Sequence, residues 1–211
     1  MQKIYLSPSE QPANKYAYGN TNEKEQCRRI AAAAEKALKR CGFDVITADA
    51  ASLAARCDQA NAWGAALYVP IHTNAFNGVV SGTRMFCYSM SGNGYKACKA
   101  IFDALAPLTI GTSESITARP ELYEVKNPLA PTAYIEVDFH DVPSVAKWII
   151  EHTDEIGEAI CKGICNYYGV AYKPAAGNTA EVDSLKKQVT ELQAENNRLR
   201  EKIAAAQKAL Q

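Results

Sequence analysis

Ala66-Leu-Tyr-Val-Pro-Ile71 is the stretch that decides the fold. It holds no charged residue, which is typical of a strand buried on both faces of a parallel sheet. His72 follows it directly, and the polar pair Thr73-Asn74 comes next. A histidine at the carboxyl end of such a strand lies at the edge where open α/β sheets bind ligands. The stretch therefore predicts a parallel sheet with a candidate functional site at His72. The alternative is that His72 has only a structural role.

Short β-like runs alternate with helical stretches on both sides of this strand, from residue 3 to about residue 170. The predicted strands are 3–6, 43–47, 66–71, 82–89, 121–125 and 132–139, and the predicted helices are 22–41, 50–63, 95–106, 143–152 and 154–168. Asn22 is the expected N-cap of the first helix, and Gly42 is expected to end it. We therefore expect a single α/β domain over residues 1–172, with a twisted, mostly parallel sheet of about six strands flanked by helices.

The composition changes abruptly after this domain. Turn-forming residues in Tyr172-Lys-Pro-Ala-Ala-Gly-Asn178 predict a linker over 173–180. Over 181–211 a heptad seam follows in steps of three and four, made of Val182, Leu185, Val189, Leu192, Asn196, Leu199, Ile203, Ala206 and Leu210.

This seam predicts a C-terminal coiled-coil helix. β-Branched residues at a and leucines at d favour two parallel strands, and the pairs Glu181 with Lys186 and Glu195 with Arg200 stand where opposite charges meet across such a dimer. We expect a homodimer through this coiled coil. The alternative is one amphipathic helix that folds back on its own domain.

The overall charge points to no polymeric partner. The 23 Lys and Arg balance the 23 Asp and Glu, so neither nucleic acid nor an anionic membrane is an expected partner. Lys3-Ile-Tyr-Leu6 follows the first methionine without the basic start or apolar core of a signal peptide, and no run of about eighteen apolar residues follows. We expect a protein synthesised in the cytoplasm without a signal peptide.

Glu136 is a second candidate for chemistry. It follows the largely apolar run 132–135, and a carboxylate buried in such a run needs a cation, a metal or a proton, because burying it alone costs several kcal/mol. If the extended run continues, Glu136, Asp138 and His140 share one face of the strand. An ion pair with a nearby Lys or Arg is the plain alternative.

Glu23 lies in the first turn of the helix 22–41, where the helix dipole favours a carboxylate. Alone it is a weak signal, because acidic residues are common at helix starts. Together, Glu23, His72 and Glu136 or His140 supply the nitrogen and oxygen ligands and the free carboxylate of a catalytic zinc site with one position open for water.

Three segments carry a family resemblance that spans residue 3 to about residue 170. Residues 60–75 end in His72-Thr-Asn-Ala75, residues 23–31 place Glu23 seven residues before Ile30-Ala31, and residues 122–139 contain Glu136 near their end. They resemble the zinc-dependent N-acetylmuramoyl-L-alanine amidases of the amidase 3 family, found in cell-wall hydrolases and phage endolysins. The resemblance implies cleavage of the amide bond between N-acetylmuramic acid and L-alanine in bacterial peptidoglycan, with Glu23 and His72 as zinc ligands and Glu136 as the general base.

The chain departs from that family at the first strand. Family members continue this strand with Asp-Pro-Gly-His-Gly, whose histidine binds zinc, whereas here the run is Ser7-Pro-Ser-Glu10-Gln11. His140 supplies the missing imidazole, Glu10 coordinates as a carboxylate, or the site has lost the metal. We favour His140 as the third ligand because zinc suits imidazole. Asp138 stands where the family has glycine, and a role as hydrogen-bond acceptor for a ligating histidine is open to it.

Two other functions remain open at this point. One is a catalytically inactive peptidoglycan-binding module that kept the amidase fold. The other is a cysteine hydrolase that uses Cys27 or Cys87 with His72. The seven cysteines are scattered without a CxxC pair, so we expect reduced thiols among apolar residues. As an enzyme, the chain fits an endolysin that acts on the cell wall after membrane permeabilisation, or an enzyme exported by a nonstandard route.

Overall fold

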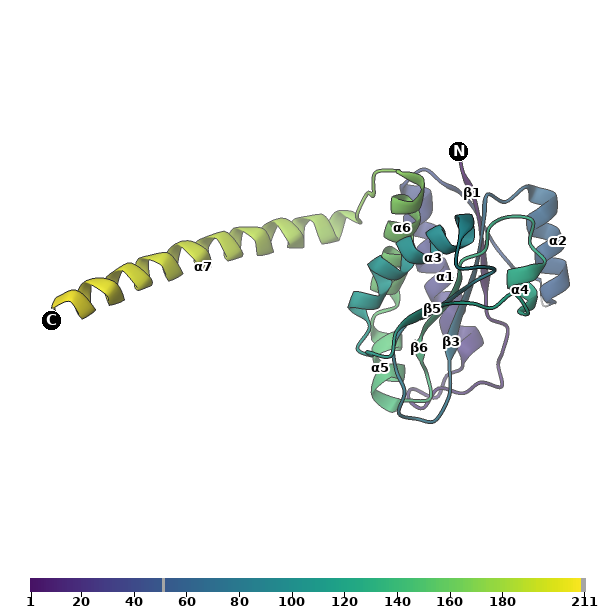
Figure 1. Ribbon diagram of the computed structural model, residues 1–211, viewed down its shortest axis with the longest axis horizontal. Helices are drawn as coiled ribbons and strands as arrows, with labels where there is room; N and C mark the ends of the chain where they lie inside the picture. The colour runs from purple at the N-terminus through teal and green to yellow at the C-terminus, as the bar shows by residue number, and fades with distance from the viewer. Residues whose placement is uncertain (51, 210–211) are drawn as a thin grey trace. The chain divides into compact units, whose positions relative to one another are not determined.

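The computed structural model describes residues 1–50 and 52–209, so Ala51 of the predicted helix 50–63 lies outside the described residues. The chain divides into two compact units, Met1–Lys173 and Pro174–Gln211. In the first unit strands and helices alternate (Figure 1). The strands are β1 (Lys3–Pro8), β2 (Asp44–Thr47), β3 (Leu67–Asn74), β4 (Arg84–Cys87), β5 (Ser115–Ala118) and β6 (Tyr134–Phe139). The helices are α1 (Glu23–Arg40), α2 (Leu53–Trp63), α3 (Gly92–Leu105), α4 (Tyr123–Lys126), α5 (Pro143–Glu151) and α6 (Thr153–Tyr168), and Ala106–Leu108 form a 3-10 turn.

The six strands form one sheet in the order β2-β1-β3-β6-β4-β5. All neighbouring pairs are parallel except β4 and β6, which are antiparallel. The deciding stretch is β3, which lies inside the sheet between β1 and β6 and is buried along almost its whole length. The predicted α/β domain with a mostly parallel, six-stranded sheet flanked by helices is confirmed.

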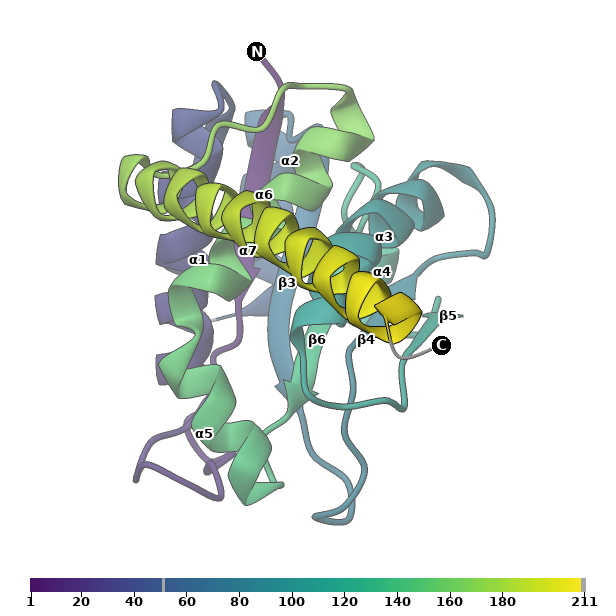
Figure 2. The same ribbon diagram turned by 90° about the vertical axis from the view of Figure 1, so that its left-hand side faces the viewer.

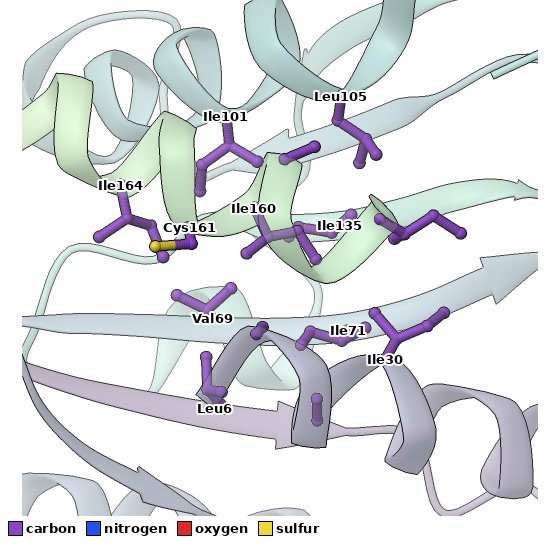
Figure 3. Close-up of a cluster of buried hydrophobic side chains, with 14 of the residues drawn as sticks. Leu6, Ile30, Val69, Ile71, Ile101, Leu105, Ile135, Ile160, Cys161 and Ile164 are labelled. Atoms are coloured by element: carbon purple, nitrogen blue, oxygen red, sulfur yellow. The ribbon is translucent and has the colours of Figure 1, made fainter. Parts of the chain in front are cut away.

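Helices cover both faces of the sheet. On one face α1, α3 and α6 pack together, while α2 and α4 lie on the other (Figure 1). Figure 2 shows α1 and α6 side by side in front of β1 and β3. The core on that face joins Ile30, Ile101 and Ile160 of the helices to Val69 and Ile135 of the strands (Figure 3).

Two glycines let α6 approach its neighbours closely. A Cβ at Gly157 would stand 2.5 Å from the Cβ of Ala33 on α1, and a Cβ at Gly163 would stand 2.4 Å from the Cα of Ile101 on α3. Real Cβ contacts are never that short, so any larger residue would push the three helices apart. The close packing fixes α1, whose first turn carries one of the candidate site residues.

Most local predictions hold, with one clear error. Asn22 caps α1, and its side chain accepts a hydrogen bond from the backbone N–H of Glu25 at 3.0 Å. The predicted strand 121–125 is wrong, because this segment forms the single helical turn α4, and the strand we did not predict is β5. One helical turn buries the adjacent residues Glu124 and Val125 on one side of the segment, whereas successive residues of a strand point to opposite faces.

The second unit is the helix α7 (Ala176–Ala209), which begins inside the stretch that we predicted as a linker. Five apolar side chains of the heptad seam are exposed along it: Leu185, Val189, Leu192, Leu199 and Ile203. Leu210 of the seam lies outside the described residues. The division into a catalytic domain, a linker and a dimerising coiled coil stays a prediction.

None of the helices in the described part of the chain combines the length and the apolar character needed to span a membrane.

Candidate active site

The candidate site lies where the carboxyl ends of β3 and β6 meet the start of α1. Asn22 is the N-cap of α1, and Glu23, the first residue of the helix, is buried. Its Oε1 lies 2.9 Å from Nδ1 of His72, and its Oε2 accepts a hydrogen bond from the side-chain amide of Asn14 at 2.6 Å. Burial raises the pKa of Glu23, but the bonds to His72 and Asn14 outweigh it and keep that pKa below its ordinary value. The structure thus brings together two of the three predicted zinc ligands, Glu23 and His72.

The other nitrogen of His72 faces a residue that sequence reasoning missed. Oε2 of Glu124, on α4, lies 3.5 Å from Nε2 of His72. Oε1 of Glu124 accepts hydrogen bonds from the Ser7 hydroxyl at 2.5 Å and from the Tyr68 hydroxyl at 2.7 Å. A carboxylate inside an apolar run was the signal that pointed to Glu136, and the run 122–125 carries the same signal. We missed it because the segment was predicted as a strand.

Two buried carboxylates hold the His72 ring between them, and this determines its charge. Burial lowers the pKa of His72, but the bonds to Glu124 and Glu23 more than offset it and raise that pKa to about 10. Burial also raises the pKa of Glu124, and its bonds to His72, Ser7 and Tyr68 bring it below its ordinary value. Without a metal, the ring is therefore an imidazolium at neutral pH, hydrogen-bonded to Glu23 and ion-paired with Glu124 at 3.5 Å.

Glu136 is the third carboxylate at this point. It stands opposite His72 in the pairing of β3 with β6. Its Oε2 is buried and has no hydrogen-bond partner among the described residues. Burial raises the pKa of Glu136 to about 7, with a partial opposing effect from the charge of His72. A carboxyl group with a pKa near neutrality and one oxygen without a described partner, in register with a histidine on the next strand, is suited to general base catalysis.

His140 follows the end of β6 and lines the same cavity. Nδ1 of His140 lies 2.9 Å from the hydroxyl of Thr73, and the ring stacks on Tyr16 at a centroid distance of 5.0 Å. Burial lowers the pKa of His140, so its ring is neutral at pH 7. The cavity has a volume of about 440 Å³ and is lined by Glu23, His72, Glu136 and His140 among others. All four predicted site residues therefore meet at one cavity.

The predicted ligands do not form a closed metal centre as they stand. Within the described part of the chain, a set of three donor atoms within 4.8 Å of one another occurs only at Cys41, Cys161 and Cys165. Glu23, His72 and His140 are therefore more widely spaced than that, and they would have to contract around one ion.

Glu10, the residue in place of the family's histidine, has three cationic partners. Its carboxylate pairs with Lys24 at 2.7 Å, with Arg56 at 3.2 Å and with Arg28. Burial raises the pKa of Glu10, but the bonds and charges of Lys24 and Arg28 hold it below its ordinary value. Glu10 lines a second cavity of about 370 Å³, which it shares with His72 and Glu124. Its charge is already balanced by protein groups, which leaves it less available to a metal than His140.

Asp138 does not act as an acceptor for a histidine. The pairing of β3 with β6 shifts between His72 and Asn74, which breaks the simple alternation of faces that we expected along the strand. Oδ1 of Asp138 accepts hydrogen bonds from the backbone N–H groups of Gly82 at 2.6 Å and Phe139 at 2.7 Å. Asp138 therefore supports a loop, while His140, beyond the shift, reaches the cavity.

The cysteine-hydrolase alternative gains no support from the described contacts. His72 contacts Glu23, Glu124 and Gln11 rather than a thiol. Burial raises the pKa of Cys27 well above its ordinary value, and the Cys87 thiol donates to the carbonyl of Ser89 at 3.1 Å. Among the described residues, no hydrogen bond joins either thiol to a histidine or a carboxylate.

Buried carboxylates around an imidazole, at the carboxyl edge of a parallel sheet, are the kind of site on which metal-dependent hydrolases are built. The chain belongs to the Amidase_3 family of N-acetylmuramoyl-L-alanine amidases, whose sequence profile matches residues 7–166. The match includes Glu10, Glu23, His72, Glu136 and His140.

Solved structures with the same fold are amidase catalytic domains. The CwlV catalytic domain from Bacillus (Paenibacillus) polymyxa var. colistinus is similar with a TM-score of 0.73 and 16% identity, over 81% of this chain and 100% of that one. AmiC2 of Nostoc punctiforme has a TM-score of 0.71 and 17% identity, over 80% and 97%. The catalytic domain of the CD27L endolysin, which targets Clostridia difficile, has a TM-score of 0.66 and 20% identity, over 79% and 98%. No curated protein matches the chain.

Proposed function

We propose that the protein is a zinc-dependent hydrolase that cleaves the amide bond between N-acetylmuramic acid and L-alanine in bacterial peptidoglycan. The observation that carries this proposal is the buried Glu23–His72 pair beside Glu136, whose Oε2 has no partner among the described residues, in a chain of the Amidase_3 family. The ligands that we propose for zinc are Glu23, His72 and His140.

The charges of the site fit a divalent cation. Three buried carboxylates, Glu23, Glu124 and Glu136, surround the single imidazole of His72. In their ordinary ionised forms they carry more negative charge than one imidazolium balances, and uncompensated buried charge is costly. A dication with nitrogen and oxygen ligands reduces that excess from two negative charges to one, because His72 loses its proton when it binds the ion, and zinc accepts this ligand set. We therefore assign Glu124 the role of holding His72, since the second nitrogen of a metal-binding histidine is commonly bonded to a carboxylate.

The residues of this chain divide the catalytic work. When bound, zinc supplies a Lewis acid that polarises the scissile carbonyl and lowers the pKa of water. Glu136 takes a proton from the attacking water and returns it to the nitrogen of the leaving L-alanine. Burial raises the pKa of Glu136, which makes its carboxylate a better proton acceptor for the first of these transfers. Because water is the nucleophile, the reaction needs no covalent intermediate on the protein.

We further propose, first, that the protein is an endolysin that acts on the bacterial cell wall and, second, that it forms a homodimer. The fold shared with the CD27L endolysin catalytic domain supports the first part. The exposed apolar seam of α7, with Asn196 at an a position, supports the second, because paired helices would cover this seam.

The presence and the ion pairs of Glu10 favour a second function, that of an inactive peptidoglycan-binding module. Glu10 replaces a zinc-binding histidine and is held by three cations, as expected of a chain that lost the metal and kept the fold as an inactive peptidoglycan-binding module.

Metal content and product analysis separate the two functions. Protein purified without chelator is expected to carry about one zinc at the site and to release new amino groups of L-alanine from purified peptidoglycan, and chelation should abolish this release. A protein without zinc at this site that binds peptidoglycan and gains no activity on zinc addition would be the inactive module. New reducing sugar ends without new amino groups would make it a glycosidase.

A further inference from the structure

Three buried thiols meet at a place far from the catalytic cavity. Cys41 caps the C-terminal end of α1, and Cys161 and Cys165 stand one turn apart on α6. Sγ of Cys161 lies 3.6 Å from Sγ of Cys41 and 3.9 Å from Sγ of Cys165. Figure 3 shows the sulfur of Cys161 beside Ile164 at the edge of the core. The described chain holds no other group of three metal-type donors this close together.

The spacing of the sulfur atoms matches a tetrahedral thiolate site. A zinc–sulfur bond is about 2.3 Å long, and a tetrahedral angle between two such bonds puts the sulfur atoms about 3.8 Å apart. The separations of 3.6 and 3.9 Å fall on either side of that value. The third pair, Sγ of Cys41 and Sγ of Cys165, also lies within 4.8 Å, so all three sulfur atoms are close enough to share one ion. The carbonyl oxygen of Lys173 lies 3.8 Å from Sγ of Cys41 and accepts a hydrogen bond from Nε of Arg40 at 2.6 Å; its second lone pair is the candidate fourth donor.

The surroundings of the thiols also favour a bound cation. Cys41 and Cys165 lie at the C-terminal ends of α1 and α6, where the helix dipoles are negative. The backbone N–H of Lys173 donates to Sγ of Cys41 at 3.3 Å, and the positive charge of Arg40, which also pairs with Glu158, acts on Cys165 in the direction that favours its thiolate.

Protonation opposes binding but does not prevent it. Burial raises the pKa of Cys165 to about 11 and also raises that of Cys161, so both are thiols at neutral pH when no metal is present. Zinc-type ions displace such protons, and their binding releases one proton for each thiol that becomes a ligand.

We propose that Cys41, Cys161 and Cys165, with the carbonyl oxygen of Lys173, form a structural site for a thiolate-binding divalent cation of the zinc type. The ion joins the end of α1, the last turns of α6 and the segment that follows α6. The site is separate from the catalytic cavity, because Glu23 begins α1 and Cys41 follows its end, and an 18-residue helix is about 27 Å long. The proposal does not depend on the amidase activity.

Cadmium titration of the reduced full-length protein tests this site directly. Thiolate-bound Cd²⁺ absorbs in the ultraviolet through sulfur-to-metal charge transfer, whereas an imidazole and carboxylate site does not. We expect one Cd²⁺ per chain to produce this band, about three protons to be released with it, and excess Zn²⁺ to remove it. The band should persist in His72→Ala, which separates this site from the catalytic one.

Substitutions identify the ligands. Cys41→Ser and Cys161→Ser should each abolish or strongly weaken the band, whereas Cys98→Ser, a matched change of a fully buried helical thiol outside the cluster, should retain it. Absence of the band in the reduced wild-type protein would refute the proposal whether or not the variants fold. A band of unchanged intensity in folded Cys41→Ser and Cys161→Ser, checked by circular dichroism, would refute it as well.

Discussion

Replacing Glu10 by glutamine decides whether this position binds metal or only balances charge. The side chains of Lys24 and Arg28 are 41% and 40% exposed, so their pairs with Glu10 contribute only about 0.5 kcal/mol each. Arg56 is fully buried, and removing the partner of a buried charge costs about 3–5 kcal/mol. Arg56 keeps its bonds to Ser7, to the Pro8 carbonyl and to the Ala50 carbonyl, and a glutamine oxygen still accepts. We therefore expect Glu10→Gln to lower the free energy of unfolding by about 2–3 kcal/mol.

The pH dependence of this loss has a definite sign. The pKa of Glu10 in the folded protein lies below its ordinary value of 4.5, so the carboxylate contributes stability above about pH 4.5, and the contribution is lost as the pH falls through the folded pKa. The stability difference between wild type and Glu10→Gln should therefore be full at pH 7 and shrink below about pH 4.5. Urea unfolding of both proteins across this range measures the difference, in which the titration of other carboxylates cancels.

Zinc content provides the second measurement on the same variant. We expect the Glu10→Gln protein to bind zinc as the wild type does. Removing the carboxylate of residue 10 changes the surroundings of Lys24 and Arg56 but leaves Glu23, His72 and His140 in place. His140→Ala is the matched comparison and should lose zinc. A Glu10→Gln protein of unchanged stability that no longer binds zinc would refute the reasoning and make Glu10 the third ligand.

Four further substitutions test the proposed roles. Glu136→Gln should reduce hydrolysis at least about 100-fold with zinc content unchanged, measured by amine release and metal analysis, and equal activity would remove Glu136 as the base. Glu124→Gln should weaken zinc binding by about 10–100-fold in competition with a chromophoric chelator, and an unchanged affinity would leave it no role in holding the histidine. Thr73→Val should weaken zinc binding while Thr73→Ser retains it, and equal affinities would show that the hydroxyl is not needed. Asn196→Leu should raise the melting temperature of the tail and give mixed oligomers by sedimentation equilibrium, whereas a wild-type monomer at about ten micromolar would refute the dimer.

The residues of the candidate site that the sequence predicts are those at the start or end of a regular helix or strand. His72 ends a strand whose apolar run could only be buried, and Glu23 follows a capping asparagine that fixes the start of α1. Glu136 is a carboxylate in an apolar run beside that strand. In each case the local pattern determines the element, and the parallel sheet then brings the ends together.

The parts that were missed depend on irregular backbone. Glu124 reaches His72 because residues 123–126 turn as a helix, although their apolar pattern is short enough to fit a strand. The register of β3 with β6 shifts near Asp138, so the expectation that Asp138 shares one strand face with Glu136 and His140 does not hold. No pattern in the sequence predicts this shift. The surroundings of Glu10 come from α1 and α2, so its ion pairs depend on tertiary packing.

The hydrogen bonds of Thr73 bear on whether His140 can replace the family's histidine. Tyr16 donates its hydroxyl proton to Oγ1 of Thr73 at 3.0 Å, and Nδ1 of His140 lies 2.9 Å from the same oxygen. A hydroxyl oxygen accepts two hydrogen bonds, so Thr73 can accept from both. In that arrangement Nδ1 of His140 carries the proton and the lone pair of Nε2 is free for a metal, as a ligating histidine requires. The same logic holds at His72, where Glu124 takes one nitrogen and leaves the other beside Glu23. Both imidazoles are thus held by an oxygen acceptor from a neighbouring element, whereas Glu10 is held by cations and lines another cavity. This contrast is why we propose the metal at the cavity that is lined by both His72 and His140.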